Sequence, residues 1–147
     1  MIKKIILAAL TSIVLLPSCK KSDNGPRKNT LVGSWLTVRA AIDNNGNGVP
    51  DANEAISVDT SAMAVYKFNA NATITINNYS NPSSGSFNGN WTLEDNDEDI
   101  KVVQTDQGSA GTSIRYHIVS LADQDLTLSF KDLLDSAQTD FLMFKRQ

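Results

Sequence analysis

Residues 86–93 read Ser86-Phe87-Asn88-Gly89-Asn90-Trp91-Thr92-Leu93, in which polar residues alternate with apolar or small ones. In an extended strand successive side chains point to opposite faces, so Phe87, Gly89, Trp91 and Leu93 fall on one face. The polar residues fall on the other face. This alternation predicts a β-strand that is buried on one side only, and helices do not produce it.

The same rhythm continues along the chain from Thr30 onward. Runs of β-branched and aromatic residues are separated by clusters of Asn, Asp, Gly and Ser roughly every ten residues, which is typical of an all-β domain. The short connections predict antiparallel hairpins. Residues 132–138 offer at most a helical turn or two. The eight predicted strands are Ser34–Ile42, Ala64–Phe68, Thr73–Tyr79, Ser86–Leu93, Ile100–Gln104, Ser113–Leu121, Leu126–Phe130 and Asp140–Lys145.

Eight sequential antiparallel strands can close into an up-and-down barrel or fold as a sandwich. Leu31-Val32-Gly33-Ser34-Trp35 resembles the Gly-x-Trp opening of the lipocalins, in which a basic residue at the end of the last strand, here Arg146, covers the tryptophan. Gly89-Asn90-Trp91 adds to a resemblance to the lipocalin-like domains of bacterial lipoproteins. The resemblance implies an eight-stranded antiparallel up-and-down barrel over residues 30–147, with structural roles for Gly33, Trp35, Trp91 and Arg146. An ordinary core tryptophan is the alternative for Trp35.

The interior of such a barrel can be open or filled. The chain is shorter than a typical lipocalin and lacks both the flanking helix and the cysteines that would pin it. An eight-stranded barrel is just wide enough to be filled by its own side chains or to hold one small ligand. Both possibilities stay open from the sequence.

Composition sets the domain number and excludes one class of partner. The chain has 147 residues, of which 41% are hydrophobic and 20% charged, as expected for a folded domain. Its formal net charge is -3, and without residues 1–18 it carries 11 basic and 16 acidic residues. This acidic balance argues against nucleic-acid binding.

Residues 1–18 have the features of an export signal: Lys3 and Lys4 precede an apolar run, Ile5 to Leu16, that is too short to span a bilayer. The segment Leu16-Pro17-Ser18-Cys19 resembles the lipobox of bacterial lipoproteins. The resemblance implies cleavage before Cys19, fatty acylation of Cys19 by palmitate-like chains, and a cell-envelope location. Lys20, where an aspartate would favour the inner membrane, indicates the outer membrane. A secreted protein with a coincidental cysteine is the alternative.

Residues 19–29 follow as a polar segment with four basic residues and no apolar period. They predict a lipid-anchored flexible tether that reaches on the order of 18 Å for ten residues. Its basic residues would either rest on anionic lipid head groups or remain solvated.

The loop after the first predicted strand fits a calcium-binding pattern. Residues 43–54, Asp-Asn-Asn-Gly-Asn-Gly-Val-Pro-Asp-Ala-Asn-Glu, match the twelve-position EF-hand loop at each specified position. A strand rather than a helix enters it, so a mobile Asn-Gly-rich connection is the alternative. We expect a weak structural Ca²⁺ site with the ligands Asp43, Asn45, Asn47, the Val49 carbonyl, Asp51 and Glu54.

No catalytic pattern stands out, and we expect no enzymatic activity. The single histidine, His117, falls on the face opposite Tyr116 and Ile118, so we expect it to be partly exposed. Asp135-Ser136-Ala137 resembles a bacterial O-glycosylation acceptor at Ser136. Two functions remain: a binding module for a small apolar ligand, which we favour, and a filled-barrel structural or interaction lipoprotein that meets another envelope protein.

Overall fold

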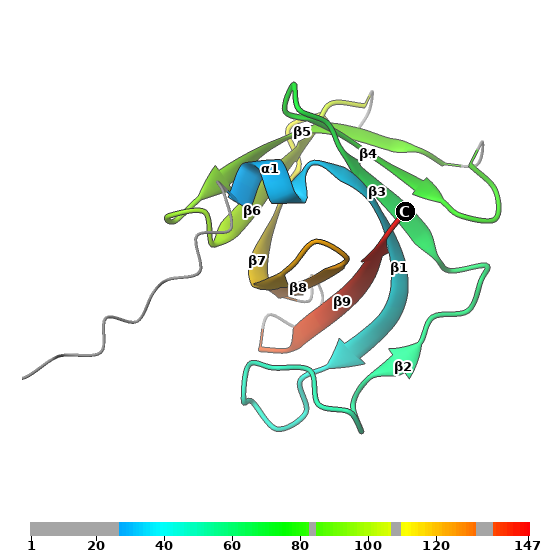
Figure 1. The fold of residues 1–147 in the computed structure, drawn as a ribbon, viewed down its shortest axis with the longest axis vertical. Coiled ribbons are helices and arrows are strands. Elements are labelled where there is room, and N and C mark those ends of the chain that lie inside the picture. The colour runs from blue at the N-terminus through cyan, green and yellow to red at the C-terminus, as the bar shows by residue number, and fades with distance from the viewer. Residues whose placement is uncertain (1–26, 83–84, 107–109, 132–136) are drawn as a thin grey trace, which may run out of the picture.

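One antiparallel sheet closes on itself to form the barrel (Figure 1). The computed structural model describes residues 27–82, 85–106, 110–131 and 137–147. A short helix, α1, covers Arg27–Leu31. The strands are β1 (Gly33–Ile42), β2 (Ile56–Ser57), β3 (Ala64–Phe68), β4 (Thr73–Asn78), β5 (Phe87–Glu94), β6 (Asp99–Gln104), β7 (Ser113–Leu121), β8 (Asp125–Lys131) and β9 (Thr139–Arg146).

The eight long strands confirm the fold predicted from the sequence. Strand β1 pairs with β3, β3 to β8 each pair with the next strand in sequence, and β9 pairs back onto β1, which completes an up-and-down barrel. Each predicted strand coincides with one of these strands, and the ends differ by no more than one residue. Periodicity identified strands such as β5 and β7 because they have one buried and one solvated face.

Two short elements were not predicted. Helix α1 includes Arg27–Asn29, which the sequence assigned to the tether, and strand β2 is only two residues long. Neither carries enough residues for a periodic pattern; β2 exists because Arg39 and Ala40 of β1 offer it backbone partners. Cys19 and the rest of residues 1–26 lie outside the described residues, as does Ser136.

Strand β1 is shared between two neighbours on one side. Its first half, Gly33 to Leu36, pairs with β3, whereas Arg39 and Ala40 pair with β2. A register shift between Thr37 and Arg39 accompanies this change of partner. Such a bulge bends a strand and increases its twist, which helps β1 to follow the barrel wall.

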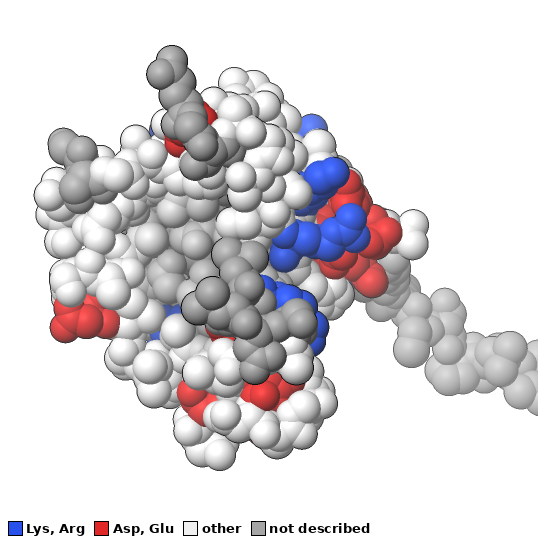
Figure 2. Space-filling model, turned by 180° about the vertical axis from the view of Figure 1, so that it is seen from behind, with Lys and Arg blue, Asp and Glu red and all other residues white. Residues whose placement is uncertain are grey.

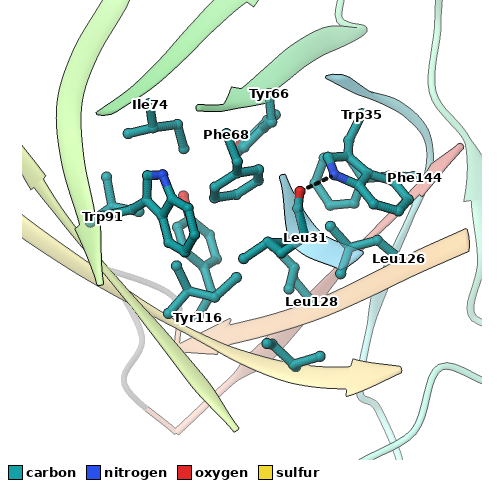
Figure 3. Packing of buried hydrophobic residues seen from close by; sticks show 13 residues of the cluster. Leu31, Trp35, Tyr66, Phe68, Ile74, Trp91, Tyr116, Leu126, Leu128 and Phe144 are labelled. Carbon is teal, nitrogen blue, oxygen red and sulfur yellow. Dashed lines mark hydrogen bonds between the residues drawn. The ribbon is translucent and has the colours of Figure 1, made fainter. Parts of the chain in front are cut away.

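Burial is graded along the barrel axis. At the end where β1 begins, the interior is packed solid, and Leu31, Trp35, Phe68 and Phe144 are at most 1% exposed (Figure 3). At the other end the inward apolar residues are only partly buried. Among the residues that the structure describes, the buried hydrophobic ones run from Leu31 to Phe144 and form one core inside the barrel. In the part of the chain that the structure describes, no helix is long and apolar enough to cross a membrane.

Candidate functional site

The closed end of the barrel is built around Trp35. Helix α1 places Leu31 inside this end, and the Trp35 indole Nε1 donates a 2.8 Å hydrogen bond to the Leu31 carbonyl (Figure 3). Both residues are 0% exposed. A buried indole N–H needs such an acceptor, so the bond couples the helix to the first strand.

Arg146 covers the same tryptophan from outside. Its guanidinium carbon lies 4.3 Å from the centroid of the Trp35 ring, a cation–π geometry. The guanidinium also donates to the carbonyls of Val32 (3.0 Å), Thr30 and Asp123 (2.6 Å). A Cβ on Gly33 would collide with Arg146 Nη1, which explains why a glycine stands at this place. Arg146 thus joins the chain's first strand, last strand and helix.

Trp91 lies in β5 at the same end of the barrel. Its ring packs edge-on to Phe68 at 5.5 Å between centroids, and its Nε1 donates to the Asn69 carbonyl at 3.2 Å. The Lys28 amine lies 5.8 Å from the ring centroid. Trp91 is therefore a structural core residue, and no part of it faces the open end.

The middle of the barrel contains three hydroxyl groups in an otherwise apolar interior. Burial raises the pKa of Tyr66 and of Tyr116, and in Tyr116 the neighbouring Tyr66 raises it further. Both phenols therefore stay neutral at physiological pH. The buried Thr37 Oγ1 has no hydrogen-bond partner among the described residues.

The open end is lined by partly buried apolar side chains. They come from the ends of six strands, all on the inward face: Ala64, Ile76, Phe87, Ile114, Phe130 and Leu142. Tyr116 packs edge-on to Phe130 with 5.7 Å between ring centroids. Apolar surface that is inward and yet incompletely covered is typical of a small-molecule site at the mouth of a barrel.

A cavity of about 320 Å³ opens at this end beside β1, β2 and β9. The register sets Ile56 of β2, Ala40 of β1 and Leu142 of β9 side by side, so β2 extends the inner wall where β3 has left β1. The lining residues are Ala40, Ala41, Ile42, Asn44, Glu54, Ile56, Phe130, Asp140, Phe141 and Leu142. The volume lies at the lower end of the range for ligand pockets.

The sequence did not single out this cavity. The inward positions of β9 are not visible as an alternation because Phe141 to Phe144 are all apolar, and β2 has no sequence signature, so this wall was missed. Asn44 and Glu54, from the loop after β1, also line the cavity. That loop was singled out for another reason.

The predicted calcium loop curls around Asp43. The Asp43 carboxylate accepts hydrogen bonds from the backbone N–H groups of Gly46 (2.7 Å), Asn47 (3.2 Å) and Gly48 (3.0 Å). Gly46 and Gly48 have positive φ angles of 71° and 76°, which glycine adopts without strain. The loop leaves β1 and ends in a turn rather than a helix.

Among the remaining predicted ligands, Asn45, Asn47 and Asp51 contact one another through their side chains. Asp51 Oδ2 accepts from the side-chain amides of Asn45 (2.7 Å) and Asn47 (3.0 Å). Glu54 is buried, and its two carboxylate oxygens accept from the backbone N–H groups of Asn44 (3.0 Å) and Asp51 (3.1 Å), which clamps the two ends of the loop.

The arrangement of the carboxylates differs from a finished metal site. The described residues contain no group of three or more His, Cys, Asp or Glu side chains placed to hold a metal ion. The donor set is nevertheless rich in oxygen, as a hard cation requires, with Asp51 beside Asn45 and Asn47. Val49, whose carbonyl was the other predicted ligand, is exposed.

His117 lies on the outer face and belongs to a solvated charge network. Its side chain is 53% exposed, and Nδ1 lies 2.8 Å from Asp99 Oδ1. Neighbouring Arg115 pairs with Asp99, Asp95 and Glu94. Figure 2, seen from behind, shows basic and acidic side chains side by side in this region. Ion pairs this exposed contribute little to stability, and the outward direction of His117 was correctly predicted.

Comparisons with known proteins agree with this geometry. The lipocalin-like domain family matches residues 31–128, which run from the Leu31 plug into β8. No curated protein matches the chain in sequence.

Solved structures share the fold at low sequence identity. A lipocalin-like protein from Bacteroides uniformis superposes with a TM-score of 0.54 at 14% identity, covering 80% of this chain and 99% of its own. An uncharacterized protein from Bacteroides eggerthii superposes with a TM-score of 0.54 at 13% identity, and the match covers 79% of this chain and 98% of that protein's chain. LTBP1 in its complex with LTC4 superposes with a TM-score of 0.54 at 13% identity, and the match covers 84% of this chain and 71% of LTBP1.

Proposed function

Because this chain belongs to the lipocalin-like domain family, we propose that it binds a small apolar ligand at the open end of its barrel. The observation that carries the proposal is the cavity of about 320 Å³ between β1, β2 and β9. Its walls are mainly apolar, and a ligand there would cover inward side chains such as Phe130 and Leu142 that are only partly buried. Burial of this surface would supply the binding energy.

The proposal is a binding function rather than catalysis. The family is one of binding proteins and is generally non-enzymatic. LTBP1, which shares the fold, was crystallised as a complex with LTC4. That ligand belongs to LTBP1, and it supports only the general idea that a barrel of this shape can hold a small molecule.

We expect the substitution Ala40→Phe to weaken ligand binding at least about tenfold, because the ring would occupy the cavity that Ala40 lines. The measurement uses residues 20–147, which contain the whole core, after removal of co-purified lipid. The neutral apolar dye N-phenyl-1-naphthylamine serves as the probe, and its fluorescence rise on binding is titrated. The melting temperature should change little, since the ring fills empty space.

Ala122→Phe is the matched control. Ala122 is exposed in the hairpin between β7 and β8 at the closed end, so the same substitution there should leave dye binding unchanged. Equal affinity for all three proteins would show that the dye binds elsewhere. An absence of binding by the unmodified protein would favour the filled-barrel interaction protein instead.

We further propose that the protein is held in the cell envelope, at the outer membrane, by acylated Cys19. The support is the sequence alone: the export signal of residues 1–18 ends in the lipobox-like Leu16-Pro17-Ser18-Cys19. Two or three acyl chains anchor a protein stably where one does not.

For the loop of residues 43–54 we propose weak, structural binding of Ca²⁺, supported by the oxygen-rich set around Asp51. Ca²⁺ at about 10 mM, ten times a millimolar dissociation constant, should stabilise the fold by about 1.4 kcal/mol and raise the melting temperature by a few degrees. Asp51→Asn should abolish the shift, whereas Asp123→Asn, an exposed site at the other end, should retain it. An equal shift with Mg²⁺ or in Asp51→Asn would contradict the proposal.

A further inference from the structure

We propose that the cavity selects apolar amines over fatty-acid anions, with Asp140 as the partner of the ammonium group. This inference rests on the proposed binding function and names its ligand class. The evidence is the charge distribution around the cavity: its walls are mainly apolar, and the charged side chains among the described lining residues are carboxylates.

Two of the residues that line the cavity are ionisable, and both are acids: Glu54 and Asp140. None of the described lining residues is Lys, Arg or His. The other side chains are apolar apart from Asn44. A fatty-acid head group would therefore meet like charge and would find no basic partner, which disfavours its ionised form in a partly desolvated site.

The two acids are not equivalent. Glu54 is buried, and both of its oxygens are already engaged by the backbone N–H groups of Asn44 and Asp51. Asp140 is half-buried and accepts one side-chain hydrogen bond among the described residues, from Gln138 Nε2 to Oδ1 at 2.8 Å. Its Oδ2 is the carboxylate oxygen best placed to receive a ligand N–H.

The register places Asp140 on the ligand side of the wall. Strand β9 pairs Asp140 with Phe130 of β8 on one side and with Ile42 of β1 on the other. Phe130 packs against the core from within the barrel, so Asp140 shares its inward face. An alkyl chain lying over Phe130 and Leu142 would thus bring its head group to Asp140.

The nearest basic side chains lie on the opposite face. Lys131 pairs with Thr139 one position along the ladder, and its Nζ donates to Thr139 Oγ1 at 2.8 Å. Arg39 pairs with Met143 and donates to the Ala55 carbonyl at 3.0 Å. Neither is among the described residues that line the cavity, so none of these supplies a cation that competes for Asp140 there.

The test compares three ligands with the same chain and different head groups: decylamine, 1-decanol and decanoate. Each displaces N-phenyl-1-naphthylamine from residues 20–147 at neutral pH and low ionic strength. We expect decylamine to bind at least about tenfold more tightly than decanoate, with decanol between them. Salt should narrow the gap between amine and acid but leave decanol unaffected.

Asp140→Asn removes the charge and keeps the shape. In this variant decylamine should bind no more tightly than decanol, while decanol binding stays within about threefold of its original value. Asp125→Asn, an identical change at an exposed site near the closed end, should preserve the amine preference. Decanoate binding as tight as decylamine, or a preference that survives Asp140→Asn, would overturn this inference while leaving the binding function intact. Failure of all three ligands to bind would instead count against the binding function itself.

Discussion

Replacing Trp35 with alanine is expected to destabilise the barrel by about 3–5 kcal/mol, a large part of the 5–15 kcal/mol that typically holds a domain together. The indole is completely buried and fills the closed end between Leu31 and Phe144. Its removal leaves a cavity, orphans the Leu31 carbonyl and exposes the underside of Arg146. Urea unfolding followed by far-ultraviolet circular dichroism measures the loss.

Trp35→Phe provides the graded control. The phenyl ring keeps much of the packing and the face beneath Arg146 but cannot donate to Leu31, so the loss should be smaller than in the alanine variant. A loss below about 1 kcal/mol for Trp35→Ala would mean that the closed end is not a packed core.

Replacing Arg146 with alanine should cost about 2–4 kcal/mol, although the residue is only half-buried. The guanidinium donates to three carbonyls from two separate segments, Thr30 and Val32 at the end of α1 and Asp123 in the turn before β8, and it covers Trp35. Without it, α1 should detach from the barrel end before the strands unfold. Hydrogen exchange of the α1 amides, compared with that of the β5 amides, would detect this local opening.

Two controls separate geometry from charge. Arg146→Lys keeps the charge but cannot reach three carbonyls from one planar group, so it should recover only part of the loss. Lys145→Ala removes the adjacent basic residue, whose amine is exposed and pairs with Asp125, and should cost well under 1 kcal/mol. Equal losses at the two positions would contradict the role assigned to Arg146.

The barrel could be predicted from the sequence because several of its strands alternate between buried and exposed residues. In β5, for example, Gly89 and Trp91 are buried while Asn88, Asn90 and Thr92 are exposed, so one strand shows the inward face by itself. Closure of the sheet was not visible in any single strand. It followed from the resemblance of Gly33, Trp35 and Arg146 to the lipocalin pattern, whose residues lie at opposite ends of the chain.

The cavity was harder to foresee because its walls depend on pairings between distant segments. Ile56 lines it only because β3 separates from β1 after Leu36 and leaves Ala40 free to pair with β2. Asp140 reads in the sequence as an ordinary polar residue at a strand start, and only its pairing with Ile42 and Phe130 places it inward. Local patterns carry no information about such neighbours.

Helix α1 and the cavity lie at opposite ends of the barrel. The described chain begins at Arg27 of α1, which lies at the plugged end (Figure 1). The cavity lies at the opposite end, beside the last residues of β1. In the lipid-anchored form proposed above, only residues 20–26 separate Cys19 from α1, so this short segment would hold the plugged end toward the bilayer. The ligand would then enter and leave on the side that faces away from the anchoring membrane. The protein would exchange its ligand with the aqueous space or with a docked donor protein, and not with the lipids of the anchoring membrane.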